Sequence, residues 1–449
     1  MNVFRKLVAT ICTLLFSFVI FCARSEAQNN LPNILLFTID ACRPDHFGCY
    51  DYQYDTTPHI DALARKGFLF TRAFSQSAWT TPGMISIFTS LYPHVHTVDA
   101  KGKTLDEDIL TLPDILKTNG YKVPVLPRFV DIPNYWHLGF DMVSKEQFQG
   151  EERGEGEDLL KLLEAYKDQK FFIWYHYHSL HLPYNPQSPY DKMFSQHIEK
   201  STSADSEAVA TVKKRSVIKA GSIGFNDNDK ETVIALYDGQ LRVLDDYIGR
   251  LVEKMKAWNI LDNTIIIITS DHGEELFEHG FIGHASTSLN AKLYDEIIHV
   301  PLIILWPKLL KPGISDELVQ QIDIMPTLLE MLGIPEPSGL QGRSLFSVIR
   351  GTSGTKSHPV FSETILGGYQ STREMEEIKL QCIRTNEWKL IRTTGTGSDR
   401  YELYNMNKDQ AEKRNVIENY PSVSNGLVKE LLRWTKTATL TGNDSPSSP

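Results

Sequence analysis

The sequence predicts an α/β sandwich built around a mostly parallel central sheet. Three observations lead to this fold class. Short, continuous apolar runs recur along the chain, stretches with helical periodicity separate them, and polar residues directly follow several of the runs. Continuous apolar runs are typical of parallel strands that are covered on both faces. Their alternation with helical stretches favours helices packed on both sides of one sheet.

The first half of the chain holds three predicted strands and two predicted helices. The apolar run Asn33–Ile39 predicts a central strand. Thr57-Pro58 opens a helix that continues to Leu63 and stops near Gly67, because proline suits the first turn of a helix and glycine suits its end. The remaining elements are a strand at 68–74, a helix at 112–117 that ends at Asn119-Gly120, and a strand at 170–177.

The second half opens with a polar stretch, Ser201–Asp229, that is poor in aromatic residues. We expect it to be an insertion or a flexible loop. Elements with clear apolar periodicity follow it. They are a long amphipathic helix at 231–258, buried strands at 264–269 and 300–305, and a helix at 322–332.

The pattern changes near Val360, where short strands begin to follow one another closely. This change predicts a small C-terminal α+β subdomain over 360–440, after an α/β domain over 28–359. Its clearest elements are strands at 380–385 and 388–393 and a final helix at 427–435. The tail at 441–449 is expected to be disordered.

The N-terminus has the pattern of a secretory signal peptide over residues 1–27. Arg5 and Lys6 precede an apolar run at 7–22, and Ser25 and Ala27 occupy the small positions of a cleavage site. The alternative is an uncleaved membrane anchor, but the run is shorter than the roughly 20 residues that a membrane span needs. We therefore expect a secreted or periplasmic protein whose mature form has no stable membrane span.

Charge and cysteine content limit the function further. The 449 residues carry a formal net charge of −10, whereas a nucleic-acid-binding protein usually has a basic balance, so we expect no nucleic-acid partner. Only Cys42, Cys49 and Cys382 follow the signal peptide, too few for a disulfide framework. A single bridge between Cys42 and Cys49 remains open.

Polar residues stand at the ends of three predicted strands, where ligands bind in open α/β sheets. Asp40 follows the first strand, Asp271-His272 follows the strand at 264–269, and His181 lies just beyond the strand at 170–177. Two carboxylates and an imidazole are a ligand set that suits a divalent cation. Taken alone, Asp40 is explained equally well as a helix cap or a turn residue. Taken alone, the Asp271-His272 pair is explained equally well as part of a turn.

The stretch SAWTTPGM at 77–84 has the form of a turn that enters a helix. Thr80 or Thr81 can cap this helix, and Pro82 suits its first turn. The free N–H groups of a helix N-terminus attract anions, and a threonine hydroxyl beside a metal can act as a nucleophile. The alternative is two capping threonines without chemistry. The expected buried face of the helix consists of Met84, Ile87, Phe88 and Leu91.

The order and spacing of a series of short motifs resemble the sulfatase branch of the alkaline phosphatase superfamily, from about Asn33 to Asn415. The motifs are Ile39–Asp45, Thr57–Ala64, Phe88–Pro93, Leu261–Thr264, Thr269–Glu274, Glu278–Gly280, Tyr294–Glu296, Val300–Ile303, Asp323–Leu329 and Tyr401–Tyr404. The resemblance implies an alkaline phosphatase-like sandwich fold and a hydrolase of sulfate or phosphate esters.

The resemblance also implies roles for individual residues. Asp40, Asp271 and His272 match metal-ligand positions. His181, in a His-x-Pro motif, matches a substrate-binding histidine, and His284 falls where family members contact the substrate anion or the leaving group. The stretch at 136–139 is similar to another family phrase and makes His137 a weaker candidate.

Three positions depart from the family pattern. Thr80 stands where ordinary sulfatases carry the cysteine or serine that is converted to formylglycine, and Met84 replaces the arginine of that motif. Ala41 replaces the second residue of an Asp-Asp pair, which removes one oxygen ligand. Because threonine carries a methyl group on its β-carbon, it cannot be oxidised to the same aldehyde, and we expect no formylglycine. Phosphodiesterases and phosphotransferases of the superfamily use an unmodified threonine at this position.

These observations together predict a metal-dependent hydrolase of sulfate or phosphate esters, with Thr80 as both nucleophile and metal ligand. One divalent ion is expected, and calcium, zinc or manganese fits the ligand set. The expected partner is an anionic ester, either a sulfated glycan or a phosphorylated headgroup. Two alternatives stay open. One is a phosphodiesterase or phosphotransferase that acts on lipid or envelope headgroups, and the other is an inactive family member that binds sulfated glycans.

Overall fold

The computed structural model describes residues 31–126, 138–143, 156–195, 205–352, 358–395 and 397–436. The predicted signal peptide, the tail at 441–449 and the candidate His137 lie outside these residues, so the predicted domain limits remain predictions. Within the described residues, no helix has the length and apolar character that crossing a membrane requires. Cys42, Cys49 and Cys382 are free thiols.

The core of the protein is a seven-stranded sheet with the order β10-β2-β9-β6-β1-β5, in which β11 also pairs with β2. Only β9 runs antiparallel to its neighbours, which confirms the predicted mostly parallel sheet. The strands are β1 (Asn33–Ile39), β2 (Phe68–Phe74), β5 (Phe172–Tyr177), β6 (Thr264–Ser270), β9 (His299–Leu305), β10 (Gly313–Ser315) and β11 (Val319–Gln320).

The register of the central strands brings their carboxyl ends to one level. Ile39, the last residue of β1, pairs with Tyr177 of β5 on one side and with Ser270 of β6 on the other. Each of these three residues closes its own strand, and all three strands run parallel. The residues that come next in the chain therefore meet at one edge of the sheet.

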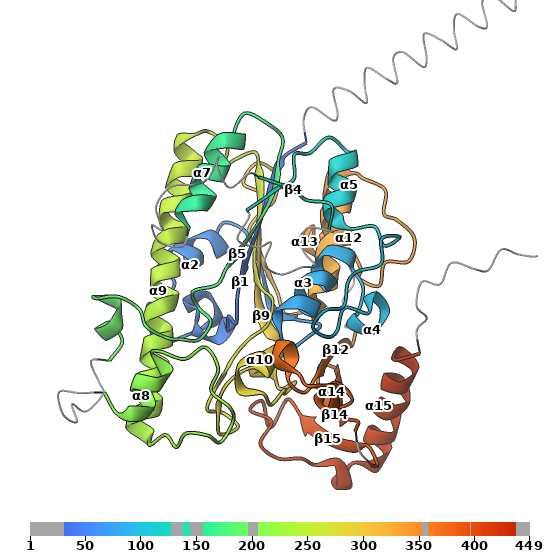
Figure 1. Ribbon diagram of the computed structural model, residues 1–449. Coiled ribbons are helices and arrows are strands. Elements are labelled where there is room, and N and C mark those ends of the chain that lie inside the picture. Colours follow the sequence, from blue (N-terminus) through green and yellow to red (C-terminus); the bar gives the residue numbers. More distant parts are fainter. Residues whose placement is uncertain are drawn as a thin grey trace, which may run out of the picture.

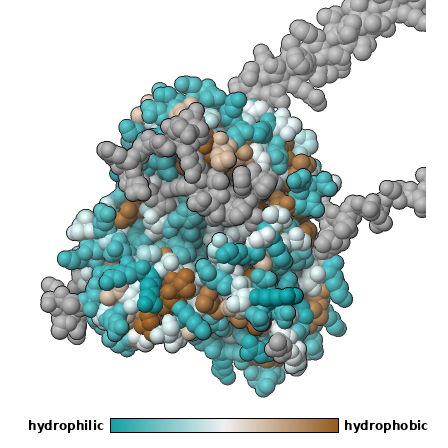
Figure 2. All heavy atoms as spheres, viewed as in Figure 1, coloured by the Kyte–Doolittle hydropathy of each residue, from teal (hydrophilic) through white to brown (hydrophobic). Residues whose placement is uncertain are grey.

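Helices cover both faces of the sheet (Figure 1). One layer contains α2 (Pro58–Ala64), α7 (Glu157–Tyr166) and α9 (Asp227–Ala257). The other contains α3 (Thr80–Thr89), α5 (Leu112–Thr118) and α12 (Ile324–Leu332). In Figure 2 the same view of the surface is mostly hydrophilic, with apolar residues in small separate groups, so the helices direct most of their apolar side chains toward the sheet.

Shorter elements connect these layers. The short helices are α4 (Pro93–His96), α8 (Glu207–Val212), α10 (Ala285–Ser288), α11 (Asp295–Ile298), α13 (Phe346–Ile349) and α14 (Arg373–Glu376). The short strands are β3 (Pro124–Val125), β4 (Asp141–Met142), β7 (Glu275–Leu276) and β8 (Ile282–Gly283).

Two sequence-based boundaries differ from the structure. The stretch expected to be a loop contains α8, whose N-terminus is capped by the side chain of Ser206. The long helix α9 begins at Asp227, four residues earlier than predicted, because Asn226 and Asp229 form a capping box there. The polar composition of this stretch predicted a loop, but three of its polar residues, Ser206, Asn226 and Asp229, cap the starts of helices.

The C-terminal subdomain is an antiparallel sheet with the order β12-β13-β14-β15, which confirms a second, smaller sheet after the α/β part. Its strands are β12 (Val360–Ile365), β13 (Lys379–Arg384), β14 (Trp388–Thr393) and β15 (Arg400–Asn405). Helix α15 (Pro421–Trp434) packs against β13 and β14. It begins six residues before the predicted start, with Pro421 in its first turn.

A buried ion cluster joins this subdomain to the main domain. Lys389 of β14 is fully buried, and its Nζ lies 2.7 Å from Asp295 Oδ1 in α11 and 2.9 Å from Glu412 Oε1. Burial alone would lower the pKa of Lys389, but the two carboxylates raise it well above its ordinary value. The lysine is therefore charged, and its removal leaves the buried Glu412 and the partly buried Asp295 without the cation that they share.

We predict that Lys389→Met lowers the free energy of unfolding by about 3–5 kcal/mol, the usual cost of removing one partner from a buried ion cluster. Chemical denaturation measures this loss. The matched control is Lys379→Met on the neighbouring strand, because Lys379 is half-exposed and its pair with Asp99 at 3.1 Å is accessible to water. Such a pair contributes at most about 1 kcal/mol. Equal losses in the two variants would contradict the prediction.

Candidate active site

The candidate active site lies where β1 and β6 end side by side. Asp40 follows β1 and Asp271 follows β6, and both carboxylates are buried. Asp271 Oδ1 accepts hydrogen bonds from the backbone N–H groups of His272, at 2.8 Å, and Ala41, at 3.2 Å. These bonds hold one oxygen of Asp271 in place and leave Oδ2 to face the site.

His272 presents its Nε2 to both carboxylates. Its Nδ1 lies 2.8 Å from the carbonyl oxygen of Gly273, and because a carbonyl only accepts, Nδ1 carries the proton. Nε2 is the ring nitrogen that faces the carboxylates, 3.4 Å from Asp271 Oδ2 and 3.7 Å from Asp40 Oδ1. A neutral imidazole oriented by a backbone carbonyl is the usual state of a histidine that binds a metal.

The buried oxygens of this group fit a divalent cation. Asp40 Oδ1 and Asp271 Oδ2 have almost no contact with solvent and no hydrogen-bond partner. Burying such an oxygen without a partner is costly, and a cation between them removes that cost. Asp40, Asp271 and His272 offer one ligand atom each within 4.8 Å of one another. Two carboxylate oxygens and one imidazole nitrogen can hold zinc, manganese or calcium.

Thr80 joins this group from the other side of the sheet. Its Oγ1 lies 3.4 Å from His272 Nε2, at the first residue of α3. The first turn of α3 approaches the site closely, since a Cβ atom on Gly83 would lie 2.8 Å from the carbonyl oxygen of Asp271. Glycine at this position lets the N-terminus of the helix, with its unpaired N–H groups, stand next to the carboxylates.

The predicted capping of this helix by a threonine is wrong. The N-cap is Trp79, with extended backbone, and no side chain caps the helix. Thr80 and Thr81 occupy its first two helical positions, where a hydroxyl no longer reaches the N–H groups that an N-cap residue serves. The helix is also buried on every side from Thr81 to Thr89 rather than along one face. Thr80 is thereby left to face the site.

Two further histidines predicted from the sequence lie beside the metal group. The His284 ring lies 4.3 Å from the His272 ring and 5.0 Å from the His181 ring, measured between centroids. Burial and the neighbouring His272 and His181 lower the pKa of His284 well below its ordinary value, which keeps it neutral. Burial also acts to lower the pKa of His181, but Asp40 and Glu274 outweigh it and raise that pKa. The pKa values of the two neighbouring histidines are thus shifted in opposite directions.

Glu274 organises these histidines and was not singled out in the sequence. Its Oε1 lies 2.9 Å from His284 Nδ1, and its Oε2 accepts a hydrogen bond of 2.9 Å from the hydroxyl of Tyr184. Burial raises the pKa of Glu274 to about 7. The one feature of the sequence that could have indicated a role for Glu274 is its position two residues after His272, in the same motif. A carboxylate that orients a neighbouring imidazole is a contact that spacing alone does not reveal.

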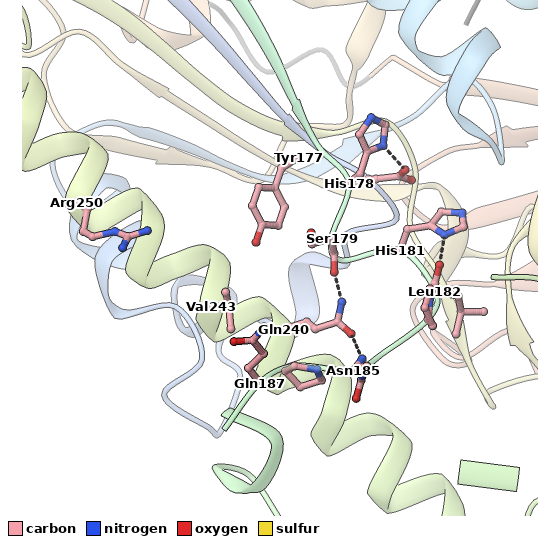
Figure 3. Close-up of a pocket in the computed structure, with 13 residues that line it drawn as sticks. Tyr177, His178, Ser179, His181, Leu182, Asn185, Gln187, Gln240, Val243 and Arg250 are labelled. Atoms are coloured by element: carbon pink, nitrogen blue, oxygen red, sulfur yellow. Dashed lines mark hydrogen bonds and ion pairs between the residues drawn. The ribbon is translucent and has the colours of Figure 1, made fainter. Parts of the chain in front are cut away.

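A cavity of about 770 Å³ opens beside the site. Figure 3 shows His178 and His181 on one side of it and the polar side chains of Asn185, Gln187 and Gln240 on another. The mixture of imidazoles, amides and apolar wall suits a polar, hydroxyl-rich ligand better than an apolar one.

His176 and His178 also reach Asp40, and neither was predicted as a site residue. His178 Nδ1 lies 3.1 Å from Asp40 Oδ2, and His176 Nε2 lies 3.7 Å from the same oxygen. Both histidines come from the end of β5, in the run WYHYH, whose aromatic character predicts a strand without assigning a role to its histidines. The two histidines are two residues apart at the end of a strand that pairs with β1, and this spacing could have indicated that both side chains face Asp40.

Comparisons with known proteins agree with this architecture. The family model described as Sulfatase matches residues 32–334, and the model described as N-sulphoglucosamine sulphohydrolase, C-terminal, matches residues 289–437. The chain is 25% identical to an ulvan-active sulfatase of Formosa agariphila, over 92% of this chain and 82% of that protein. It is 23% identical to an N-acetylglucosamine-6-O-sulfatase of Bacteroides thetaiotaomicron, over 88% of this chain and 84% of that protein.

Solved structures share the fold. A phosphonate monoester hydrolase of Agrobacterium radiobacter has a TM-score of 0.70 at 23% identity, covering 90% of this chain and 95% of that one. A structure described as a complex with its substrate D-glucosamine-2-N,6-O-disulfate has a TM-score of 0.71 at 22% identity and covers 90% of this chain. The alkaline phosphatase-like fold that the motifs implied is thereby confirmed. Because the Sulfatase model matches well over half of the sequence, this chain belongs to the sulfatase family.

Proposed function

We propose that the protein hydrolyses sulfate or phosphate esters with the unmodified hydroxyl of Thr80 as the nucleophile. The observation that carries this proposal is the position of Thr80 Oγ1, 3.4 Å from His272 Nε2 and at the N-terminus of α3. An anionic ester placed there meets helix N–H groups, a histidine with a raised pKa and the attacking oxygen together. The convergence of Asp40, Asp271 and His272 favours this enzyme over an inactive glycan-binding protein.

Each step has a residue to perform it. Asp40, Asp271, His272 and Thr80 would hold a divalent cation, which when bound lowers the pKa of the hydroxyl and offsets the charge of the ester. Thr80 loses its hydroxyl proton to solvent, and its Oγ1 forms a bond to sulfur or phosphorus as the bond to the leaving oxygen breaks. His181, with its raised pKa, donates a proton to that oxygen. Neutral His284 accepts a proton from the water that cleaves the Thr80 ester, which releases the inorganic anion and restores the hydroxyl.

The relatives suggest the class of substrate. They are named for ulvan and for N-acetylglucosamine, and one structural neighbour is a complex with a sulfated glucosamine. A sulfated glycan is therefore the first substrate to test, and the polar cavity beside the site accommodates sugar hydroxyl groups. A phosphodiesterase or phosphotransferase is the second candidate, because Thr80 stands where formylglycine precursors carry cysteine or serine. A panel of aryl sulfate, phosphate diester, phosphonate ester and sulfated oligosaccharides separates the two.

We expect Thr80→Ala to lower kcat by at least about a thousandfold on the best substrate of this panel, because it removes the attacking oxygen. Thr80→Ser keeps a hydroxyl and should retain activity. The matched control is Thr81→Ala, since Thr81 is the adjacent buried residue and does not contact His272 in the way that Thr80 does. Steady-state kinetics measure all three variants. Normal turnover by Thr80→Ala would point to water as the nucleophile.

Asp271→Asn tests the proposed cation. The amide oxygen can still accept from the backbone of His272 and Ala41, so the fold should survive. The loss of negative charge should lower the affinity for a divalent ion and remove most of the activity. Titration calorimetry reports the affinity, and the thermal melting of the metal-free protein reports the fold. Unchanged affinity in a folded variant would show that Asp271 is no ligand.

We also propose export, with cleavage after Ala27, on the basis of the charged start, the apolar run and the small residues at Ser25 and Ala27. N-terminal sequencing of the protein from its native host should find Gln28 as the first residue. An intact Met1 would contradict this expectation and favour the uncleaved anchor.

A further inference from the structure

The two oxygens of Asp40 face different sets of histidines. Oδ1 is directed toward His272 of the proposed cation site, at 3.7 Å, whereas Oδ2 is directed toward His176 and His178 of β5. We propose that Asp40 bridges two divalent cations, and that Oδ2 with His176 Nε2 and His178 Nδ1 forms the second site. This inference rests on the proposed function only through Asp40, which the two sites share.

The distances in this second group match the separations between ligands of one ion. His178 Nδ1 lies 3.1 Å and His176 Nε2 lies 3.7 Å from Asp40 Oδ2. The three ligand atoms all lie within 4.8 Å of one another. Two atoms that are each about 2.1 Å from an ion lie no more than about 4.2 Å apart. The distance of 3.7 Å is longer than an ordinary hydrogen bond, and His176 Nε2 also lies 3.8 Å from Asp271 Oδ2, so this nitrogen faces both carboxylates.

The hydrogen bonds around Nδ1 of His176 orient this side chain as a metal ligand. Thr38 Oγ1 lies 2.8 Å from His176 Nδ1 and also accepts a hydrogen bond of 2.9 Å from the indole N–H of Trp174. The hydroxyl proton of Thr38 is directed to the carbonyl oxygen of Tyr175, at 3.4 Å. Thr38 can therefore accept the Nδ1 proton of His176, which places a lone pair on Nε2 toward Asp40.

The second group faces the substrate cavity. Asp40 and His178 both line the cavity of about 770 Å³, and His178 is partly exposed to it (Figure 3). Three protein ligands next to an open cavity leave positions for water or for an oxygen of the ester, as in catalytic metal sites. Two imidazoles and one carboxylate favour zinc or another first-row divalent ion over calcium. An ion held there would help to neutralise the charge of the ester.

Metal stoichiometry tests the proposal. The mature full-length protein is stripped with a chelator, titrated with zinc by calorimetry, dialysed, and analysed for bound metal by mass spectrometry. We expect two zinc ions per chain in the wild type and one in His178→Ala. His178 is partly exposed, so this variant should fold, whereas His176→Gln alters a buried residue and serves as a second variant. Cobalt substitution should show the absorption of one histidine-rich site lost in His178→Ala.

The matched control is His59→Ala. His59 belongs to another group of possible ligands, with Asp245 and Asp246, but its ring is about half exposed and lies away from the cavity of Asp40. This variant should keep two ions. One ion per chain in the wild type would overturn the proposal, and so would two ions in His178→Ala or one ion in His59→Ala.

The failure of this inference is distinguishable from failure of the proposed function. Asp271→Asn should lose the first ion and keep a zinc ion at the second site. If two ions bind as expected but Thr80→Ala turns over normally, the nucleophile is wrong and the second site stands. If Thr80→Ala is inactive and the wild type binds one ion, the nucleophile stands and the second site is wrong.

Discussion

The parallel register of β1, β5 and β6 is the constraint on which the rest of the site depends. Ile39, Tyr177 and Ser270 end their strands at one level, so the residues that follow them in the chain lie close together at one edge of the sheet. Polar side chains occupy these positions, and most of them are buried. The sheet thus forces Asp40 and Asp271 together in a place that water hardly reaches. A pair of buried carboxylates at such an edge is stable only with a compensating positive charge.

The protein supplies part of that charge with histidines. Asp40 and Glu274 raise the pKa of His181, and the same histidine contributes to lowering the pKa of Asp40. His284, only 5.0 Å away, is kept neutral by its buried position and its histidine neighbours. The pKa values of two chemically identical side chains are thereby moved apart, which is the arrangement that acid and base catalysis at one pH requires. Asp40 Oδ1 and Asp271 Oδ2, which have no hydrogen-bond partner, are the oxygens proposed to bind a cation.

The sequence predicted the sheet, its helices and the C-terminal subdomain because apolar runs and helical periodicity report burial directly. It placed Asp40, Asp271 and His272 at strand ends, and the structure brings these residues together. It could not reveal that His176 and His178 turn toward Asp40, since side-chain direction at a strand end depends on the register with β1. It also misjudged the start of α3, because two threonines before a proline look like caps until Trp79 is seen at the capping position.

Thr80 and Met84 both depart from the sulfatase pattern, and the two departures are best understood together. Met84 is fully buried in the hydrophobic core, one helical turn beyond Thr80, where the resemblance to sulfatases leads one to expect an arginine. An arginine at this depth would need a carboxylate partner, and its charge would help to hold an anion near the nucleophile. With methionine there, the charge of the ester must be balanced from elsewhere. His181 lies on the cavity wall, where its raised pKa favours positive charge, and a cation bound at Asp40 would serve the same purpose. In the proposed mechanism, the charge that binds the anion therefore lies beyond the ends of β1 and β5 and not on α3.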